Sequence, residues 1–480
     1  MNVGIWMLLL LMGYYGLLLL IAKWVGRQRG NDAFFTGNRN SPWYVVAIGM
    51  VGTSVSGVSF ISVPGMVREN GFLYMQTVLG FFVGYILIAN VLLPLYYRLN
   101  TASIYEYLEK RFGPRAYKTG AAYFLLAKSL GAAAKAYVIV LLLHTLLFQS
   151  WSIPFVVTTF LFVFLIWNYT RHSGIKTLVW TDAFQTIALV VSLVWIIVAF
   201  SKALGFNLSE AYTQIKASPF SQLVETTDWH SKQHVVKQFF SGIFIALVMT
   251  GLDQDMIQKN RTISTLRNSQ KNMYWYGFGF IPLNLLFLSL GALMLLFAHQ
   301  QGINLPATSD EILPMLATGG YLPMTATLLF ALGIVSASFS SADSSLTAMT
   351  TSYCIDIAGK PNDERYRKWV HAGFSLLLVV LILGFRLVNH PSLIDAIYIL
   401  VSYTYGPLLG LYAFGLLTKR KAKDRFIPWI ALASPVFCFI LQAALKHWFN
   451  YAMGYELLML NGLFTFTGLL STSKKAVYGD

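Results

Sequence analysis

The feature that most constrains this chain is its succession of long apolar runs. A helix of about 20 residues, rising 1.5 Å per residue, spans the hydrocarbon core of a bilayer, and thirteen runs are long enough. Only 11% of the residues are charged, against roughly 25% in an ordinary soluble domain. A water-soluble enzyme is therefore excluded, and we expect a single all-α membrane domain over residues 1–480. The thirteen runs cover residues 3–24, 41–66, 72–98, 117–148, 153–170, 177–203, 235–256, 272–299, 323–356, 366–386, 391–417, 426–447 and 454–472.

The positive charges indicate how these runs cross the membrane. With the N-terminus outside, the inward loops and the C-terminal tail hold 26 of the 35 Lys and Arg residues, and the outward loops hold seven. This bias matches the positive-inside rule, and shifting the number of spans by one would reverse it. We therefore expect a multi-pass protein of the cell (inner) membrane with its C-terminus in the cytoplasm. Because the formal net charge of +15 belongs to these loops, nucleic acid is not expected as a partner.

Two of the runs are interrupted by residues that an apolar helix disfavours. GMVGTSVSGVSFISVPG covers residues 49–65, and MTGLDQDMIQ covers residues 249–258. An Asp at the centre of a membrane helix costs about 2.5 kcal/mol or more. Non-helical backbone at that depth binds ions and polar groups of solutes in transporters, although small residues such as those at 49–65 also serve tight helix packing.

The spacing of the two interruptions predicts an inverted repeat. They lie five runs apart, and because five is odd the second unit enters the membrane from the opposite side. We therefore expect two repeats, over about residues 41–203 and 235–417, with peripheral helices at 3–24, 426–447 and 454–472.

A third polar cluster lies in the run 323–356, where residues 336–347 contain seven hydroxyl groups and one carboxylate. Some of these serines are explained by hydrogen bonds to carbonyl groups of their own helix. Hydroxyl and carbonyl oxygens with few full charges suit a hard monovalent cation such as Na⁺. The residues are Ser336, Ser338, Ser340, Ser341, Asp343, Ser344, Ser345 and Thr347.

Through six motifs, the chain resembles the sodium:solute symporter family over nearly its whole length. The resemblance implies the inverted-repeat fold of the leucine transporter, with one extra N-terminal and two extra C-terminal helices. It also implies a protein that works as a monomer and that uses Na⁺ as coupling ion with no other metal or cofactor. An enzyme is not expected, because His144, His172 and His371 lie on different segments with no paired motif. The motifs are SVSGVSFISVPG (54–65), SIYEYLEKRFG (103–113, read as a short amphipathic helix over 103–112), GIKTLVWTDAFQ (174–185), DQDMIQ (253–258), SASFSSADSSLTAMTTSYCID (336–356) and YTYGPLLGLYAFGLLTKR (403–420).

The resemblance implies a sodium site between the runs 41–66 and 323–356. Its ligands would be the backbone carbonyls of Gly52, Val55 and Ala337 and the hydroxyls of Ser340 and Ser341. Whether one or two sodium ions are carried per cycle stays open.

Some members of the family have a second sodium site built on the Asp of a WTD motif. The matching residue is Asp182, with Ser344 and Ser345 as partners beside Ser341. Asp343, which stands where some relatives have a serine, is the fourth candidate residue of this site and changes the ligand set. A structural charge near the start of a helix is the alternative for Asp182.

The solute site implied by this fold lies beside the interruptions. The glucose-type relatives have a Gln at Ser59, a carboxylate near Phe82 and a Lys near Phe280, and this chain has none of them. The candidate solute-binding residues are Ser56, Ser59, Phe60, Phe82, Tyr85, Met249, Asp253, Gln254, Asn284, Tyr398 and Tyr403.

Two lysines and one further carboxylate lie inside apolar runs. Lys128 and Lys135 are seven residues apart on one face of the run 117–148. They either attract an anion, or snorkel, or pair with a buried carboxylate. For Asp255 we expect a structural role toward the cytoplasmic loops.

The predicted function is sodium-coupled secondary active symport of a small organic solute into the cell by alternating access. The missing sugar-site residues favour a small organic anion, such as a monocarboxylate or sialic acid. A sodium/sugar or sodium/polyol symporter of the same fold is the alternative. An ion channel or a solute sensor is the alternative from a different class.

Overall fold

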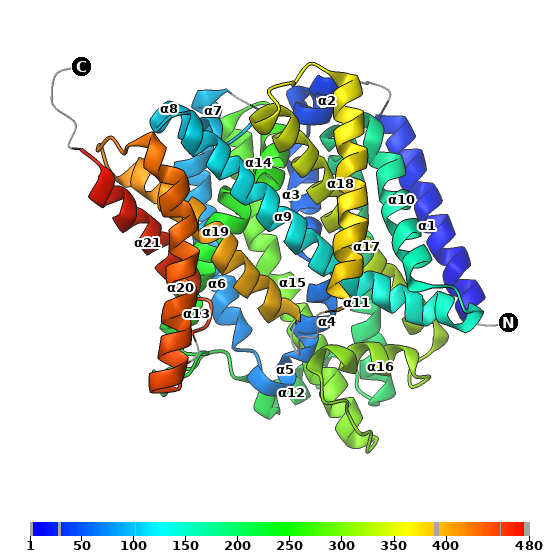
Figure 1. Cartoon of the computed structure of the whole chain (residues 1–480). Helices are drawn as coiled ribbons and strands as arrows, with labels where there is room; N and C mark the ends of the chain where they lie inside the picture. The colour runs from blue at the N-terminus through cyan, green and yellow to red at the C-terminus, as the bar shows by residue number, and fades with distance from the viewer. Residues whose placement is uncertain (1–2, 27–29, 101, 388–392, 452, 475–480) are drawn as a thin grey trace.

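The chain folds into a bundle of helices (Figure 1). The computed structural model describes residues 3–26, 30–100, 102–387, 393–451 and 453–474. Within these residues the only β pairing is an isolated bridge between Lys421 and Lys474. The prediction of an all-α protein is therefore confirmed. The first two residues of the run 391–417 and the end of the tail from residue 475 lie outside the described residues.

Each predicted run contains a helix or a pair of helices. In the described part of the chain, nine helices are long and apolar enough to cross a membrane, and eleven spans result if each of two bent pairs counts as one. Because α10 and α21 are shorter, the number thirteen stays a prediction. The helices are α1 (Val3–Val25), α3 (Trp43–Ser54) with α4 (Gly57–Gly65), α6 (Tyr74–Leu87) with α7 (Leu93–Leu99), α9 (Pro114–Leu143), α10 (Phe155–Ser173), α11 (Ile175–Ala203), α13 (Val235–Ala246) with α14 (Gln254–Arg261), α15 (Leu266–Gln300), α17 (Met324–Ser352), α18 (Glu364–Phe385), α19 (Leu393–Leu417), α20 (Ile427–Phe449) and α21 (Leu457–Thr472).

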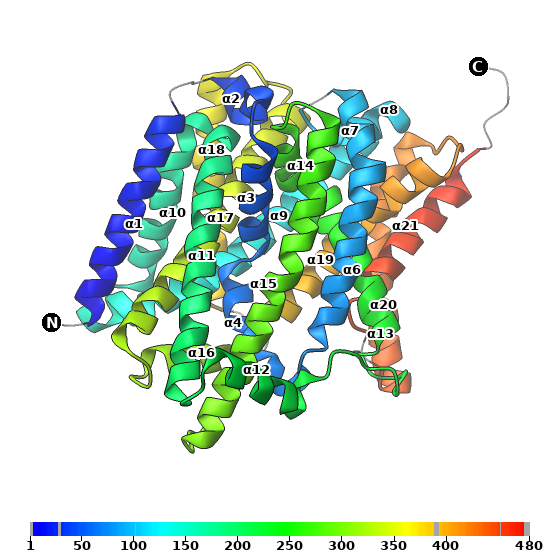
Figure 2. The same ribbon diagram turned by 180° about the vertical axis from the view of Figure 1, so that it is seen from behind.

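Short helices lie at the two ends of the bundle (Figures 1 and 2). α2 (Asn31–Thr36) and α8 (Glu106–Arg111) lie at one end, and α5 (Val67–Asn70), α12 (Leu208–Ala217) and α16 (Ile312–Thr318) at the opposite end. α8 falls within the predicted amphipathic helix and is anchored by Arg111. The guanidinium group of Arg111 donates hydrogen bonds to the carbonyl oxygens of Gly415 and Thr418. It thereby satisfies carbonyl groups that the end of α19 leaves without partners.

Both predicted interruptions are breaks in a helix. Trp43–Ser54 and Gly57–Asn70 are bent by 61° relative to each other, and Val235–Gly251 and Gln254–Arg261 by 63°. Val55 (φ −88°, ψ 99°) and Asp253 (φ −102°, ψ 122°) have extended backbone at the two breaks. Hydrogen bonding along each helix stops there, so backbone carbonyl and amide groups become available inside the bundle.

Small residues bring the helices around the breaks close together. α6 packs against α13, and α17 packs against α3, α4, α9 and α11. A Cβ atom on Gly80 of α6 would lie 2.1 Å from the carbonyl oxygen of Phe239, and one on Gly242 of α13 would lie 2.3 Å from that of Thr77. The two backbones therefore touch, as at other interfaces of membrane helices that carry small residues.

Candidate functional site

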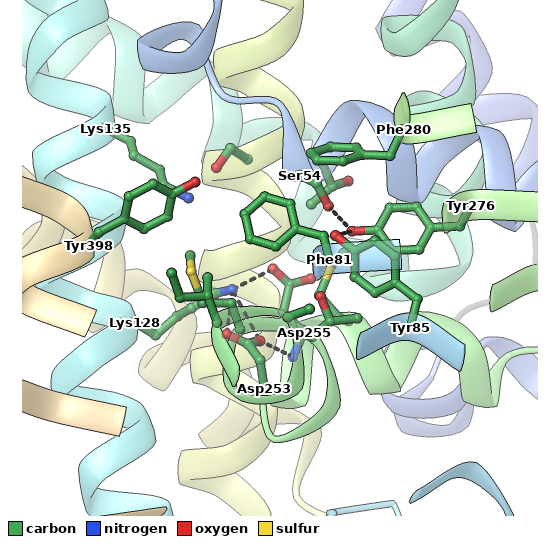
Figure 3. A pocket seen from close by; sticks show the side chains of 17 residues that line it. Ser54, Phe81, Tyr85, Lys128, Lys135, Asp253, Asp255, Tyr276, Phe280 and Tyr398 are labelled. Atoms are coloured by element: carbon green, nitrogen blue, oxygen red, sulfur yellow. Dashed lines mark hydrogen bonds and ion pairs between the residues drawn. The ribbon is translucent and has the colours of Figure 1, made fainter. Parts of the chain in front are cut away.

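A cavity lies beside both helix breaks (Figure 3). Its empty volume is about 590 Å³ when the part that opens to solvent is included. Figure 3 shows Lys135 and Tyr398 on one side of the cavity and Ser54, Tyr276 and Phe280 on the other. The lining residues are Thr53, Ser54, Phe81, Tyr85, Lys128, Lys135, Ile245, Ala246, Met249, Thr250, Asp253, Asp255, Met256, Tyr276, Phe280, Ser341 and Tyr398.

One wall of the cavity is built from the aromatic rings of tyrosines, which carry hydroxyl groups, and of phenylalanines, which do not. The hydroxyl groups of Tyr276 and Ser54 are 2.6 Å apart, and the Tyr276 hydroxyl donates to that of Tyr85 over 2.9 Å. The rings of Phe81 and Phe280 pack at a centroid distance of 6.0 Å. Such a wall offers apolar surface with a few fixed hydrogen-bonding groups, which is typical of sites for small organic molecules.

The two lysines of α9 have different surroundings. Lys128 Nζ lies 3.1 Å from Asp253 Oδ2 and 2.8 Å from Asp255 Oδ2, so Lys128 pairs with buried carboxylates. Lys135, two turns further along α9, also lines the cavity. Among the residues that the structure describes, its ammonium group has no hydrogen-bond or ion-pair partner. This ammonium group therefore has hydrogen-bond donors available to an acceptor in the cavity.

A second polar cluster surrounds Asp182 of α11, next to the break between α3 and α4. The Asp182 side chain is fully buried. Its Oδ1 accepts a hydrogen bond from Ser340 over 2.8 Å, and its Oδ2 accepts one from Ser344 over 3.2 Å. Lys259 Nζ of α14 lies 2.7 Å from the same Oδ2 and 2.5 Å from Thr53 Oγ1.

A chain of ion pairs joins this cluster to the cavity. Lys259 Nζ is 3.8 Å from Asp255 Oδ1, Asp255 pairs with Lys128, and Lys128 pairs with Asp253. At its far end Asp253 Oδ2 accepts a hydrogen bond from the hydroxyl of Tyr405 over 2.6 Å. The chain alternates three carboxylates with two ammonium groups, so its formal charge is −1.

A comparison with models of known protein families shows which family this chain belongs to. The profile described as "Sodium:solute symporter family" matches residues 34–424, which is most of the chain. The chain belongs to the sodium:solute symporter family. The family resemblance that the six sequence motifs carried is thereby confirmed.

Individual relatives agree with this membership of the sodium:solute symporter family. The sodium/sialic acid symporter NanT of Aliivibrio fischeri is 23% identical over 478 residues, covering 95% of this chain and 92% of that protein. The sodium/sialic acid symporter SiaT of Proteus mirabilis is 23% identical over 437 residues, covering 85% and 84%. A solved structure of a Na⁺-coupled sialic acid symporter superposes with a TM-score of 0.83 at 20% identity, over 99% of both chains. This last match confirms the predicted transporter fold.

The residues that the family resemblance implies for the first sodium site lie on two helices that pack together. Gly52 lies in the last turn of α3 and Val55 directly after it, where carbonyl groups lack an intrahelical partner. Ala337, Ser340 and Ser341 lie on α17, which contacts α3. Gly52 also has a steric role, because a Cβ atom there would lie 2.0 Å from the Thr186 hydroxyl oxygen of α11.

Of the four residues predicted for a second site in this symporter-family chain, the structure brings two together. Asp182 and Ser344 are hydrogen-bonded. The Ser345 hydroxyl instead donates to the carbonyl oxygen of Ser341 in its own helix over 2.7 Å. Asp343 Oδ2 instead accepts a hydrogen bond from Tyr169 of α10 over 2.5 Å.

Sequence reasoning did not predict Thr53 and Lys259 in this cluster. Thr53 directly follows the predicted ligand Gly52 within the interruption 49–65, so its hydroxyl could have been included. Lys259 follows Asp255 by four residues, and residues four apart lie on one face of a helix. The spacing of Asp255 and Lys259 was therefore the sequence signal from which an ion pair of Lys259 could have been predicted.

Only some of the candidate solute-binding residues of this symporter-family chain line the cavity. Tyr85, Met249, Asp253 and Tyr398 line the cavity, whereas Ser56, Ser59, Phe60, Phe82, Gln254, Asn284 and Tyr403 do not. Phe60 packs between the rings of Phe287 and Phe330. Gln254 binds the backbone at Ala102 and Ile104.

The other candidate solute-binding residues that do not line the cavity lie within helices or contact neighbouring helices. Asn284 donates to the carbonyl oxygen of Phe280 one turn earlier in α15. The Tyr403 hydroxyl donates to Gln442 of α20. Phe82 faces Gly277 of α15, and Ser56 and Ser59 belong to the start of α4.

Proposed function

We propose that this chain is a sodium-coupled symporter that moves a small organic anion into the cell. The observation that carries the proposal is the ammonium group of Lys135, which lines the cavity and has no partner among the described residues. A buried ammonium group is stable when its N–H groups have hydrogen-bond acceptors. A solute carboxylate beside Lys135 supplies them. The two relatives named sodium/sialic acid symporters support this class, because sialic acid carries a carboxylate.

The coupling Na⁺ binds, in this proposal, between α3 and α17. Its ligands are the carbonyl oxygens of Gly52, Val55 and Ala337 and the hydroxyls of Ser340 and Ser341. Support comes from the end of α3, which leaves the carbonyls of Gly52 and Val55 without intrahelical partners. Ser341 also lines the solute cavity, so the ion and the solute bind next to each other and each favours binding of the other.

Transport proceeds by alternating access of two inverted repeats, 41–203 and 235–417, within one domain that works as a monomer. Na⁺ holds α17 against α3 and completes the cavity, the solute closes it on the outer side, and the bundle then opens inward. The end of the bundle that carries α2 and α8 faces the cytoplasm, because 26 of the 35 Lys and Arg lie in loops and a tail on that side. The N-terminus is then outside and the C-terminus is in the cytoplasm.

Uptake into proteoliposomes tests this function. Purified protein is reconstituted, and entry of radiolabelled N-acetylneuraminate, lactate and glucose is measured with an inward gradient of Na⁺ and, separately, of K⁺. We expect Na⁺-dependent entry of at least one carboxylate and no entry of glucose. Na⁺-dependent glucose entry would support the sodium/sugar alternative, and large currents without solute coupling would support a channel.

A further inference from the structure

We propose that the ammonium group of Lys259 is a tethered cation that occupies the Asp182 cluster in place of a second Na⁺. The symporter then couples one Na⁺ to each solute molecule. This inference rests on the proposed sodium coupling and specifies its stoichiometry. It assigns to the Asp182 cluster a function other than the one expected from its sequence motif.

The contacts of Lys259 are those of a bound cation. Its Nζ lies 2.7 Å from Asp182 Oδ2 and 2.5 Å from Thr53 Oγ1, and both members of the ion pair are almost completely buried. The remaining contacts of the carboxylate are the hydroxyls of Ser340, Ser344 and Thr53. These hydroxyl and carboxylate oxygens are the kind of ligands that Na⁺ uses, and one ammonium group already engages two of them.

The backbone that carries Lys259 is held in place. α14 begins at the second helix break, and the side chains of Gln258, Lys259 and Asn260 are all buried. Gln258 Nε2 donates to the carbonyl oxygen of Phe35 over 2.8 Å and to the Thr351 hydroxyl over 3.1 Å. The Lys259 ammonium is therefore fixed inside the protein, where its nearest carboxylate is Asp182 and Asp255 lies further away at 3.8 Å.

The charges around the cavity agree with a single sodium ion. The chain from Asp182 to Asp253 has a formal charge of −1, and Lys135 brings the total of these six groups to zero, with the Asp343 carboxyl, which is hydrogen-bonded to Tyr169, outside the count. One Na⁺ and one solute carboxylate add opposite charges and keep that balance. A second Na⁺ at Asp182 would lie next to the Lys259 ammonium and would leave an extra positive charge buried, which is strongly disfavoured.

The two cation positions share the hydroxyl group of Ser340, which couples them. Ser340, a proposed ligand of the first Na⁺, donates to Asp182, and its hydroxyl oxygen lies 3.0 Å from that of Thr53. Thr53 in turn accepts from Lys259. The Lys259–Asp182 pair therefore positions Ser340 for the coupling ion, and through Asp255 and Lys128 it extends to the solute cavity.

Equilibrium binding of radioactive Na⁺ to the purified full-length protein in detergent tests the inference without knowledge of the solute. We expect one Na⁺ per wild-type molecule. Lys259→Met removes the ammonium but keeps an unbranched side chain, so we expect two Na⁺. Lys259→Arg keeps the charge and is expected to bind one. Lys259→Met combined with Asp182→Asn removes the carboxylate as well and is expected to return to one.

Each result separates this inference from the proposed function. Two Na⁺ per wild-type molecule, or one per folded Lys259→Met molecule, would overturn the tethered cation and leave sodium symport standing. A wild-type protein that binds no Na⁺ would overturn the sodium coupling itself. If Lys259→Met does not yield monodisperse protein, the wild-type stoichiometry still decides, since one bound ion supports the inference and two contradict it.

Discussion

Lys259 and Asp182 form an ion pair with a distance of 2.7 Å between Nζ and Oδ2, and neither side chain is exposed by more than 1%. The pair joins α14, which follows the second helix break, to α11. Asp182 is also bonded to Ser340 of α17, and Lys259 to Thr53 at the end of α3. Four helices that must move or hold together during alternating access therefore meet at one buried charge pair.

Removal of the proposed sodium-binding hydroxyls is expected to weaken Na⁺ binding. In the variant Ser340→Ala/Ser341→Ala, two of five ligands are lost, and we expect the apparent affinity for Na⁺ to fall at least about tenfold, equivalent to roughly 1.4 kcal/mol. The measurement is uptake of a carboxylate solute against Na⁺ concentration. Ser338→Ala is the matched control, because the Ser338 hydroxyl donates to the carbonyl oxygen of Ile334 in its own helix. Unchanged sodium dependence in the double variant would refute the site.

Lys135 is expected to set the affinity for a carboxylate solute. Lys135→Gln removes a charge-assisted hydrogen bond, which contributes about 1.5 to 3 kcal/mol, so we expect KM to rise roughly 10- to 100-fold. Lys135→Arg keeps the charge and should retain most of the affinity. Equal KM values for the wild type and Lys135→Gln would show that the anion binds elsewhere.

The buried and exposed lysine pairs are expected to differ in their contribution to stability. Lys128→Met leaves Asp253 without its buried cation and weakens the charge balance at Asp255, and loss of one partner of a buried pair costs about 3 to 5 kcal/mol. Lys368→Met is the control, since Lys368 and Glu364 form an exposed pair at 2.9 Å, for which about 0 to 1 kcal/mol is expected. Thermal unfolding of the purified proteins measures both. Similar melting temperatures for the two variants would contradict the structural role of Lys128.

The contact between α3 and α11 has no space for a side chain at position 52. Gly52→Ala places a methyl group 2.0 Å from the Thr186 hydroxyl oxygen, and such overpacking costs about 1 to 3 kcal/mol. We expect a lower melting temperature and weaker Na⁺ binding, because α3 must shift away from α11. Gly131→Ala on α9 is the control, since nothing lies within 4 Å of the added carbon. A Gly52→Ala protein as stable as Gly131→Ala would argue against this packing.

Much of the fold follows from the sequence because apolar length and interrupted helices are local properties. The breaks at Val55 and Asp253 lie where Gly, Ser and Asp residues interrupt the apolar runs 41–66 and 235–256. Side-chain direction is different, since each residue turns a helix by about 100°. Tyr403 follows Tyr398 by five residues, so it points about 140° away and contacts Gln442 of α20 rather than the cavity.

The ion pair of Lys259 and Asp182 could not be predicted from the sequence, because it too depends on how helices pack. Lys259 lies just beyond the apolar run 235–256, and its partner Asp182 is 77 positions away in the chain. Helical spacing relates Lys259 to Asp255 but contains no information on which other helix lies opposite. Only the packing of α14 against α11 and α3 brings the ammonium of Lys259 to Asp182 and Thr53.

The most direct test of sodium-coupled anion symport is the reciprocal stimulation of two fluxes in proteoliposomes. Entry of radiolabelled N-acetylneuraminate or lactate is measured as Na⁺ is varied, and entry of radioactive Na⁺ is measured as the same solute is varied. We predict that raising the concentration of either species accelerates entry of the other, with one Na⁺ entering per solute anion. Because no net charge moves in a cycle, we predict that a change of membrane potential leaves the final accumulation ratio of the solute unaltered. Solute entry at equal rates in Na⁺ and in K⁺, with no solute-stimulated entry of Na⁺, would contradict sodium symport.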